Sequence, residues 1–165
     1  MAIPERFSNL PEYAFPRLRT LLSGLSPAAD PVVMTIGEPR HAVPEFTARI
    51  MADSIAEFGK YPPNEGTPDL LAAISGWIRR RHGIEVEPAR ITALNGTREG
   101  LFNAALALCP ETKAGQRPAI LIPNPFYQVY AVAAAAVGAE PVFVPATEAT
   151  GFLPRYGDLD PAVLD

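Results

Sequence analysis

Apolar side chains recur at helical spacing in three amphipathic stretches in the first half of the chain, residues 15–25, 44–58 and 67–82. In the second stretch, for example, Phe46, Ile50, Ile55 and Phe58 follow one another at intervals close to a helical turn or its multiples. A glycine near the end of each stretch offers a stop signal: Gly24, Gly59 and Gly83. These patterns predict three helices.

The helix predicted after residue 67 has the clearest start. Thr67 is suited to the N-cap position, Pro68 to the first helical position and Asp69 to the first turn. The loop before it, residues 60–67, contains two prolines and a glycine, which exclude regular structure there. The residues expected to form the buried face of this helix are Leu70, Ile74, Trp77 and Ile78.

Short apolar runs alternate with helical stretches in the second half of the chain. The predicted strands are 90–94, 119–122 and 140–146, the predicted helices are 98–109 and 126–137, and an earlier strand is predicted within 31–39. Strands alternating with helices indicate parallel pairing through crossovers, so we expect an α/β fold. Residues 150–165 are predicted to form a turn and the opening of another helix. Two or three parallel strands leave open edges, which is typical of the first part of a larger sheet.

Charge and composition narrow the classes of function. The formal net charge is −4, and basic residues are scattered apart from the run 79–81, whose place at a helix end suits the helix dipole. We therefore expect neither nucleic acid nor a membrane as a partner. Cys109 is the only cysteine, which excludes an internal disulfide and a cysteine-based zinc site. The start lacks signal-peptide character and the longest apolar run, around 131–139, is too short to span a bilayer, so a cytoplasmic protein is expected.

The stretch "LNGTREG" (94–100) is the first candidate site. Gly96 lies where a predicted strand turns into a helix, so the first amides of that helix are expected to point outwards and to favour an anion such as phosphate. Thr97 adds a hydroxyl group and Arg98 a positive charge. A purely structural turn remains the alternative, because Asn-Gly turns are common. The stretch is neither a Walker loop nor a dinucleotide fingerprint, which argues against a nucleotide-binding domain.

The stretch "NPFYQVY" (124–130) is the second candidate site. It follows the next predicted strand, and ligands of open parallel sheets bind beyond the carboxyl ends of the strands. A phosphate at Gly96 would bring an attached ring near Tyr127, which could stack on it while Phe126 points into the core. The alternative is that both rings only pack. His41 and His82 lie far apart and no spacing predicts a metal site.

Taken in order, five motifs resemble the class I family of pyridoxal-phosphate-dependent aminotransferases. They are "IGEP" (36–39), "YPPNEGTPDLLAAI" (61–74), "ITALNGTREGLFNA" (91–104), "NPFYQVY" (124–130) and "GAEPVFVP" (138–145). Within the family the chain looks closest to the succinyldiaminopimelate aminotransferase branch of lysine biosynthesis. The resemblance implies part of the three-layer sheet of the large domain, incomplete here and preceded by small-domain segments. Residues 1–45 would be an N-terminal arm and small-domain portion, and 46–165 the first part of the cofactor-binding large domain.

The resemblance also implies roles for individual residues. The backbone amides of Thr97 and Arg98, after Gly96, would hold the phosphate of pyridoxal 5'-phosphate, with help from either side chain. Tyr127 would stack on the pyridine ring. Gly37 would lie against the substrate carboxylate, and Tyr61 would reach the cofactor phosphate of the other subunit, so that a homodimer shares its active sites.

The family's catalytic groups have no match in this chain. Its two lysines, Lys60 and Lys113, stand in contexts unlike that of the Schiff-base lysine. The aspartate on the pyridine nitrogen and the arginine that binds the substrate carboxylate also belong to a later region of the family's sequence. We therefore assign no catalytic residue here, and expect the chain to be the N-terminal part of an aminotransferase that is inactive alone.

The expected reaction of the complete enzyme is transfer of an amino group between a donor, glutamate, and a 2-oxo acid. The branch resemblance names succinyldiaminopimelate as the substrate, and Arg40 beside the "IGEP" turn as a possible contact for its extra carboxylates. Two alternatives stay open. One is a class I aminotransferase with another substrate, and the other is a lysine-less, non-catalytic module that binds pyridoxal phosphate or another phosphorylated ligand.

Overall fold

The computed structural model describes residues 4–8, 10 and 12–164, and the chain divides into two compact units. The first unit combines residues 1–24 with residues 94–165, and the second consists of residues 25–93. The predicted division of the protein into a small-domain portion (1–45) and a large-domain portion (46–165) concerns the complete enzyme, and it stays a prediction.

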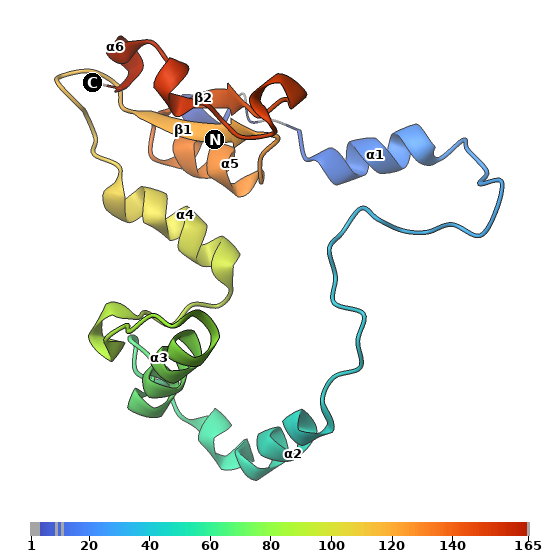
Figure 1. Ribbon diagram of the computed structural model, residues 1–165, viewed down its shortest axis with the longest axis vertical. Coiled ribbons are helices and arrows are strands. Elements are labelled where there is room, and N and C mark those ends of the chain that lie inside the picture. Colours follow the sequence, from blue (N-terminus) through green and yellow to red (C-terminus); the bar gives the residue numbers. More distant parts are fainter. Residues whose placement is uncertain (1–3, 9, 11, 165) are drawn as a thin grey trace. The chain divides into compact units, whose positions relative to one another are not determined.

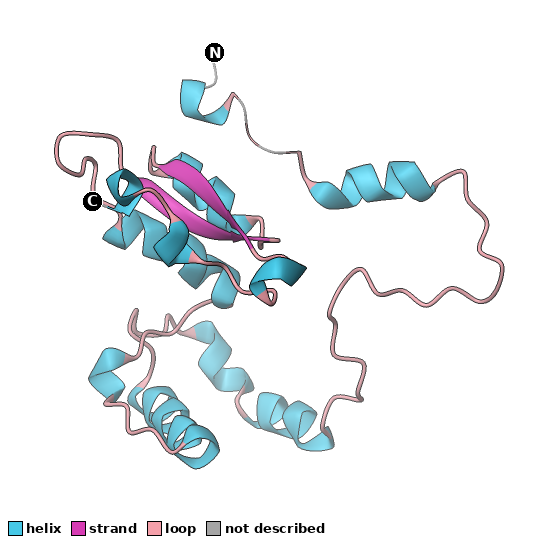
Figure 2. Ribbon diagram, turned by 45° about the horizontal axis from the view of Figure 1, so that its top comes forward, coloured by secondary structure: helices cyan, strands magenta, loops and turns pink. Residues whose placement is uncertain are grey.

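A parallel pair of strands forms the centre of the first unit (Figures 1 and 2). Strand β1 (Ala119–Asn124) pairs in parallel with β2 (Glu140–Pro145), and helix α5 (Val129–Ala136) connects them. The predicted parallel strand-helix-strand unit is therefore confirmed, although α5 begins three residues later than predicted. Asn124 and Pro125 precede it as a turn that breaks the regular backbone.

The buried core of the described residues lies within this strand-helix-strand unit. Its buried core side chains are apolar and mostly small: Ile122, Ala131, Ala133, Ala134, Ala139 and Val144, and Pro118 directly before β1 is buried as well. Four of the six are alanines, which allow the backbone of α5 to approach the two strands closely. Ile122 is the one large side chain in the set, and only 1% of its surface remains exposed.

Further helices complete the first unit. Helix α4 (Thr97–Leu108) packs against α5, and so does a short 3₁₀ helix, Glu5–Phe7, near the start of the chain. The remaining elements are α1 (Ala14–Leu22), the 3₁₀ turns Glu148–Thr150 and Tyr156–Asp158, and α6 (Pro161–Leu164). The predictions of a helix near 15–25, of another at 98–109 and of a helix opening near the last residues are confirmed.

Arg117 links the two strands at the end where both begin. Its Nε donates to the carbonyl oxygen of Gly138 at 2.8 Å and one Nη to that of Ala139 at 2.9 Å, while the other Nη pairs with the Glu140 carboxylate at 2.5 Å. Gly138 has φ of 75°, a conformation that glycine adopts without a Cβ clash. The arginine thereby satisfies carbonyl groups where α5 passes into β2.

The second unit contains helices and irregular backbone. Its helices are α2 (Glu45–Asp53), followed by the 3₁₀ turn Ile55–Gly59, and α3 (Pro68–His82), followed by the 3₁₀ turn Pro88–Arg90. Thr67 caps α3 as predicted, because its hydroxyl oxygen accepts the Leu70 amide at 3.3 Å. Gly83 ends the helix with a left-handed φ of 68°.

Two contacts join α3 to the segments on either side of it. The Ser75 hydroxyl donates to the carbonyl of Val86 at 2.6 Å, and the Ala93 amide approaches the carbonyl of Glu65 at 3.4 Å. The first bond ties α3 to the segment after it, and the second joins the loop before α3 to the end of the unit. They hold backbone groups together without enclosing an apolar core.

Three predictions for the second unit and its boundary are wrong. Residues 31–39 and 90–94 form no strand, because neither has a partner strand to bond with. In the first of these segments Val32 is 82% exposed and Met34 86%, so its apolar residues are uncovered. The predicted buried face of α3 is also only partly covered, with Leu70 45% and Trp77 53% exposed.

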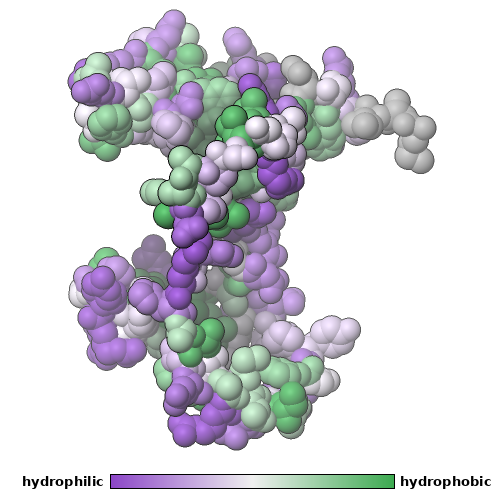
Figure 3. All heavy atoms as spheres, turned by 90° about the vertical axis from the view of Figure 1, so that its right-hand side faces the viewer, coloured by the Kyte–Doolittle hydropathy of each residue, from purple (hydrophilic) through white to green (hydrophobic). Residues whose placement is uncertain are grey.

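Figure 3 shows hydrophobic residues at many points on the surface, in agreement with these exposures. Among the described residues no helix is both long and apolar enough to cross a membrane.

Candidate functional site

The start of α4 has the geometry expected of an anion site. Gly96 is the residue before the helix, with φ of 99° and ψ of 156°, and no side chain caps the helix amides. A φ of this sign strains any residue with a Cβ, so glycine is required by the backbone. The amides of Thr97 and Arg98 accordingly have no side-chain partner among the described residues, and they lie on the exposed side of the turn.

Glu99 modifies this site. Its carboxylate accepts the Asn95 amide at 2.6 Å, so that it satisfies one backbone group just before the helix. A carboxylate in the first turn is favourable to the helix dipole, but it repels an anion bound at the same helix end. The adjacent Arg98 guanidinium carries the opposite charge and offsets that repulsion.

The turn after β1 presents two rings to different surroundings. Phe126 is half-buried and packs against Phe143 of β2, with ring centroids 4.9 Å apart. Tyr127 is 42% exposed and lies next to Tyr130 of α5 in an edge-to-face contact, with centroids 6.0 Å apart. The Asn124–Pro125 peptide bond in this turn is cis.

Arg98 and Tyr127 join the two turns. The Arg98 Nε donates to the Tyr127 hydroxyl at 2.5 Å, although the residues are 29 positions apart in the sequence. The guanidinium carbon also lies 5.5 Å from the centroid of the tyrosine ring, within range of a cation–π contact. The structure thus brings together the two stretches that the sequence suggested could face one ligand.

The Tyr127 hydroxyl raises the pKa of Arg98 above its ordinary value, mainly through this hydrogen bond, and Tyr13 adds a smaller contribution. The guanidinium is therefore charged at every working pH. Sequence reasoning did not identify Tyr13, since nothing in the irregular stretch before α1 distinguishes it. The role of Glu99 could have been predicted, because a glutamate at the third position of a helix often accepts a hydrogen bond from a backbone amide just before the helix.

These residues fit pyridoxal phosphate at both ends. The open amides of Thr97 and Arg98, a hydroxyl group and a fixed cation suit a phosphate group, and the exposed ring of Tyr127 offers a flat surface for a pyridine. The fit has one unfavourable element, the negative charge of Glu99.

Gly37 and Tyr61 belong to the second unit. Gly37 lies in an exposed bend, and no heavy atom comes within 4 Å of the position that a Cβ would take. The Tyr61 side chain is fully exposed and has no ring or hydrogen-bond partner among the residues that the structure describes. Arg40 is likewise exposed in the same unit.

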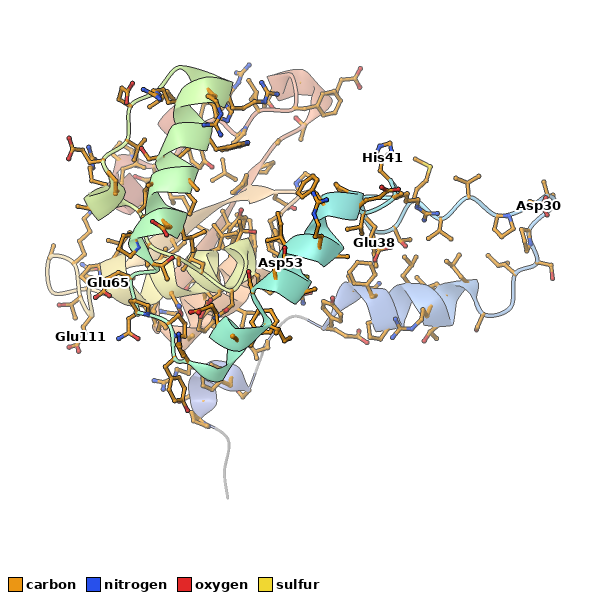
Figure 4. The ribbon with its side chains drawn as sticks, turned by 90° about the horizontal axis from the view of Figure 1, so that it is seen from below. Asp30, Glu38, His41, Asp53, Glu65 and Glu111 are labelled. Carbon is orange, nitrogen blue, oxygen red and sulfur yellow. The ribbon has the colours of Figure 1, made fainter. Side chains whose placement is uncertain are left out.

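The two lysines have surface contacts. Lys60 forms an ion pair with Glu57 at 3.2 Å, and the Lys113 ammonium donates to the carbonyl of Leu164 at 2.8 Å. Within residues 4–8, 10 and 12–164, no three His, Cys, Asp or Glu side chains gather as a metal site would need. In the second unit, Asp30, Asp53 and Glu65 project from separate segments (Figure 4).

The first unit also contains an open apolar groove of about 530 Å³ between α4, α5 and β1. Leu101, Leu108, Ile120 and Tyr130 are among its lining residues, while Thr97 and Tyr127 are not. The groove does not include Arg98 or Tyr127, although Tyr130 lines it and contacts the Tyr127 ring.

Comparison with known proteins places these features in a family. Residues 29–165 match the family described as aminotransferase class I and II. An LL-diaminopimelate aminotransferase from Syntrophobacter fumaroxidans is 32% identical over 94% of this chain, and one from Dehalococcoides mccartyi is 27% identical over 99%. The chain spans about two fifths of these relatives, 39% and 42% of their lengths.

Solved structures agree. An aminotransferase from Neisseria meningitidis superposes with a TM-score of 0.85 at 32% identity, covering 98% of this chain and 41% of that one. The aminotransferase AspB from Helicobacter pylori gives a TM-score of 0.80 at 32% identity over 91% of this chain and 39% of its own. The predicted α/β aminotransferase fold is therefore confirmed in its incomplete form. The chain belongs to the class I and II aminotransferases, a family that depends on pyridoxal phosphate.

Proposed function

We propose that the complete protein is an aminotransferase and that the cluster around Arg98 is part of its cofactor site. The observation that supports this most directly is the contact between Arg98 and Tyr127, because it unites an anion-binding turn with an exposed aromatic ring. Neither turn alone favours a function over a structural role.

In this proposal the residues of the chain bind and orient. The amides of Thr97 and Arg98 hold the phosphate at the start of α4, and the Thr97 hydroxyl adds a donor. The Tyr127 ring supports one face of the pyridine. When bound, pyridoxal phosphate supplies an electron sink for negative charge developing at the substrate carbon. No acid–base residue is assigned within this chain.

The substrate is proposed from the relatives and from the sequence motifs. The motifs favour succinyldiaminopimelate, whereas the curated relatives quoted above are named LL-diaminopimelate aminotransferases. Both substrates are diaminopimelate derivatives with a carboxylate far from the reacting amine. Arg40, exposed near Gly37, is proposed as a contact for that distant carboxylate.

We further propose a homodimer with shared sites. The full exposure of Tyr61 supports this, since an uncovered tyrosine is free to meet another chain. Gly37 is proposed to lie against the substrate carboxylate, where its lack of a side chain permits close approach. The assignment of 1–45 to the small domain and 46–165 to the large domain belongs to the same proposal.

The test is an assay of the full-length protein loaded with pyridoxal phosphate. Succinyldiaminopimelate and LL-diaminopimelate are offered in turn with 2-oxoglutarate, and glutamate formation is measured. Turnover of succinyldiaminopimelate supports the branch suggested by the motifs. Turnover of LL-diaminopimelate alone would show that the protein catalyses the reaction for which the relatives are named. Cofactor binding without turnover of any amino acid would instead favour a non-catalytic binding module.

A further inference from the structure

The Arg98 side chain links α4 to the turn that precedes α5. Its backbone belongs to the first turn of α4, and its guanidinium reaches the ring that precedes α5. Helices α4 and α5 pack together, so the bases of both side chains are held at a fixed separation. The Arg98–Tyr127 hydrogen bond therefore bridges two anchored points.

The Tyr127 ring needs such a bridge. It lies outside α5, in the irregular turn, and 42% of its surface is exposed. It meets the Tyr130 ring of α5 in an edge-to-face contact, and the exposed part of the side chain leaves room for rotation. The hydrogen bond to its hydroxyl group and the guanidinium beside its ring restrict that rotation.

The chain near residue 12 approaches the same place. The Gln128 amide donates to the carbonyl of Glu12 at 3.4 Å, and the 3₁₀ helix Glu5–Phe7 packs on α5. Tyr13 follows directly and adds to the field that raises the pKa of Arg98. The printed contacts of the guanidinium are to the Tyr127 hydroxyl and ring.

We propose that Arg98 is a positioning residue whose guanidinium holds the Tyr127 ring in the orientation that the cofactor's pyridine requires. This inference rests on the proposed function and adds a role to the one implied for Arg98 at the phosphate. Acting through Tyr127, the side chain affects the ring end of the cofactor, while its backbone amide serves the phosphate end.

The test is a double-mutant cycle on the full-length protein, with Arg98→Ala, Tyr127→Phe and the double variant. Tyr127→Phe keeps the ring and removes only the hydroxyl that Arg98 contacts. The dissociation constants of pyridoxal phosphate and of pyridoxal, which lacks the phosphate, are measured by fluorescence titration of the cofactor-free protein. Visible circular dichroism per bound cofactor reports the orientation of the pyridine, a property that a merely structural role would not alter.

If Arg98 acts through Tyr127, each single substitution weakens the binding of both ligands by a similar factor. That factor is about threefold to tenfold, as expected for loss of one hydrogen bond. The double variant is then no weaker than either single one, because both remove the same contact. The circular dichroism of bound cofactor decreases in all three. Arg98→Lys behaves like Arg98→Ala, since a lysine does not offer a donor in the geometry of Nε.

Other results overturn the inference. If the fold change in the dissociation constant of the double variant equals the product of the two single fold changes, Arg98 and Tyr127 act independently. Weaker binding of pyridoxal phosphate with unchanged binding of pyridoxal would assign the Arg98 side chain to the phosphate alone. Wild-type cofactor binding and circular dichroism in Arg98→Lys would show that Arg98 contributes only its charge. If Arg98→Ala does not fold, Arg98→Lys combined with Tyr127→Phe gives the same cycle. A wild-type protein that binds neither ligand contradicts the proposed function, a result distinct from all of these.

Discussion

The strand-helix-strand unit of residues 119–145 and the second unit, residues 25–93, differ in how well their apolar side chains are covered. Among the described residues, the six buried residues of the apolar core lie in the former, whereas no residue of the latter is buried. Helices nevertheless form in both regions close to where local signals predict, although α5 begins three residues later than predicted and α2 ends at Asp53, before the predicted stop at Gly59. Local signals are therefore sufficient to define helices, but burial requires a neighbour that pairs or packs with them.

The largest effect is expected from the core of the first region. Ile122→Ala removes a side chain that is 1% exposed and should lower the free energy of unfolding by about 2–5 kcal/mol. Ile50→Ala in α2 is the matched control, because Ile50 is 56% exposed and its truncation should change stability by less than about 0.5 kcal/mol. Urea unfolding of the full-length protein measures both. Equal losses of stability in the two variants would show that α2 is covered in the complete protein. The two regions would then not differ in how well their apolar side chains are covered.

Much of the fold was predictable from the sequence because its signals are local. Thr67, Pro68 and Gly83 define α3, and the runs at 119–122 and 140–146 predict β1 and β2 in parallel. The strands predicted at 31–39 and 90–94 are absent, because a strand forms only with a partner strand. The apolar pattern of a segment does not reveal whether such a partner is present. The same division holds for the site, since Gly96, Arg98 and Tyr127 were identifiable, whereas Tyr13 and the Arg98–Tyr127 bond depend on how distant segments pack.

A second prediction contrasts two tyrosines of the first unit. Tyr127→Ala should weaken retention of pyridoxal phosphate by about 1 kcal/mol, roughly fivefold, beyond the effect of Tyr127→Phe, because a stacking surface is lost as well as the hydroxyl. Tyr156→Ala is the control, since that ring has similar exposure, 39%, and lies near the other end of the unit's sequence. Equilibrium dialysis against the cofactor measures both. An unchanged affinity in Tyr127→Ala would exclude the stacking role.

A third prediction tests the second region, where α3 depends on its own ends. Thr67→Ala removes the oxygen that accepts the Leu70 amide and should cost about 1 kcal/mol of unfolding free energy. Thr67→Ser keeps that oxygen and should retain most of the stability. Were Thr67→Ala neutral, packing with parts of the protein beyond this unit would have to hold the helix start instead.

The smallest effect concerns Tyr61, the fully exposed counterpart of Tyr127. Tyr61→Phe should weaken cofactor binding about twofold to fivefold in the dimer, through loss of one hydrogen bond, and leave isolated monomers unchanged. Binding is titrated above and below the protein concentration at which dimers dissociate, as judged by sedimentation. An equal effect in monomers would contradict a role across the subunit interface.

The Arg117 contacts have a consequence for the distant turn that contains Tyr127. They act at the first residues of β1 and β2, where the Glu140 amide also donates to the carbonyl of Pro118 at 2.8 Å. A shift of one residue between the strands would move buried side chains such as Ile122 to the other face of the sheet, so the pairing is fixed in steps of two residues. Strand β1 has six residues, so that Ala119 and Asn124 lie about 17 Å apart along the chain. Arg117 therefore helps to fix the position of the turn that contains Tyr127, although it acts at the opposite end of the strands. Substitutions of Arg117 are expected to disturb the cofactor site even though Arg117 does not contact it.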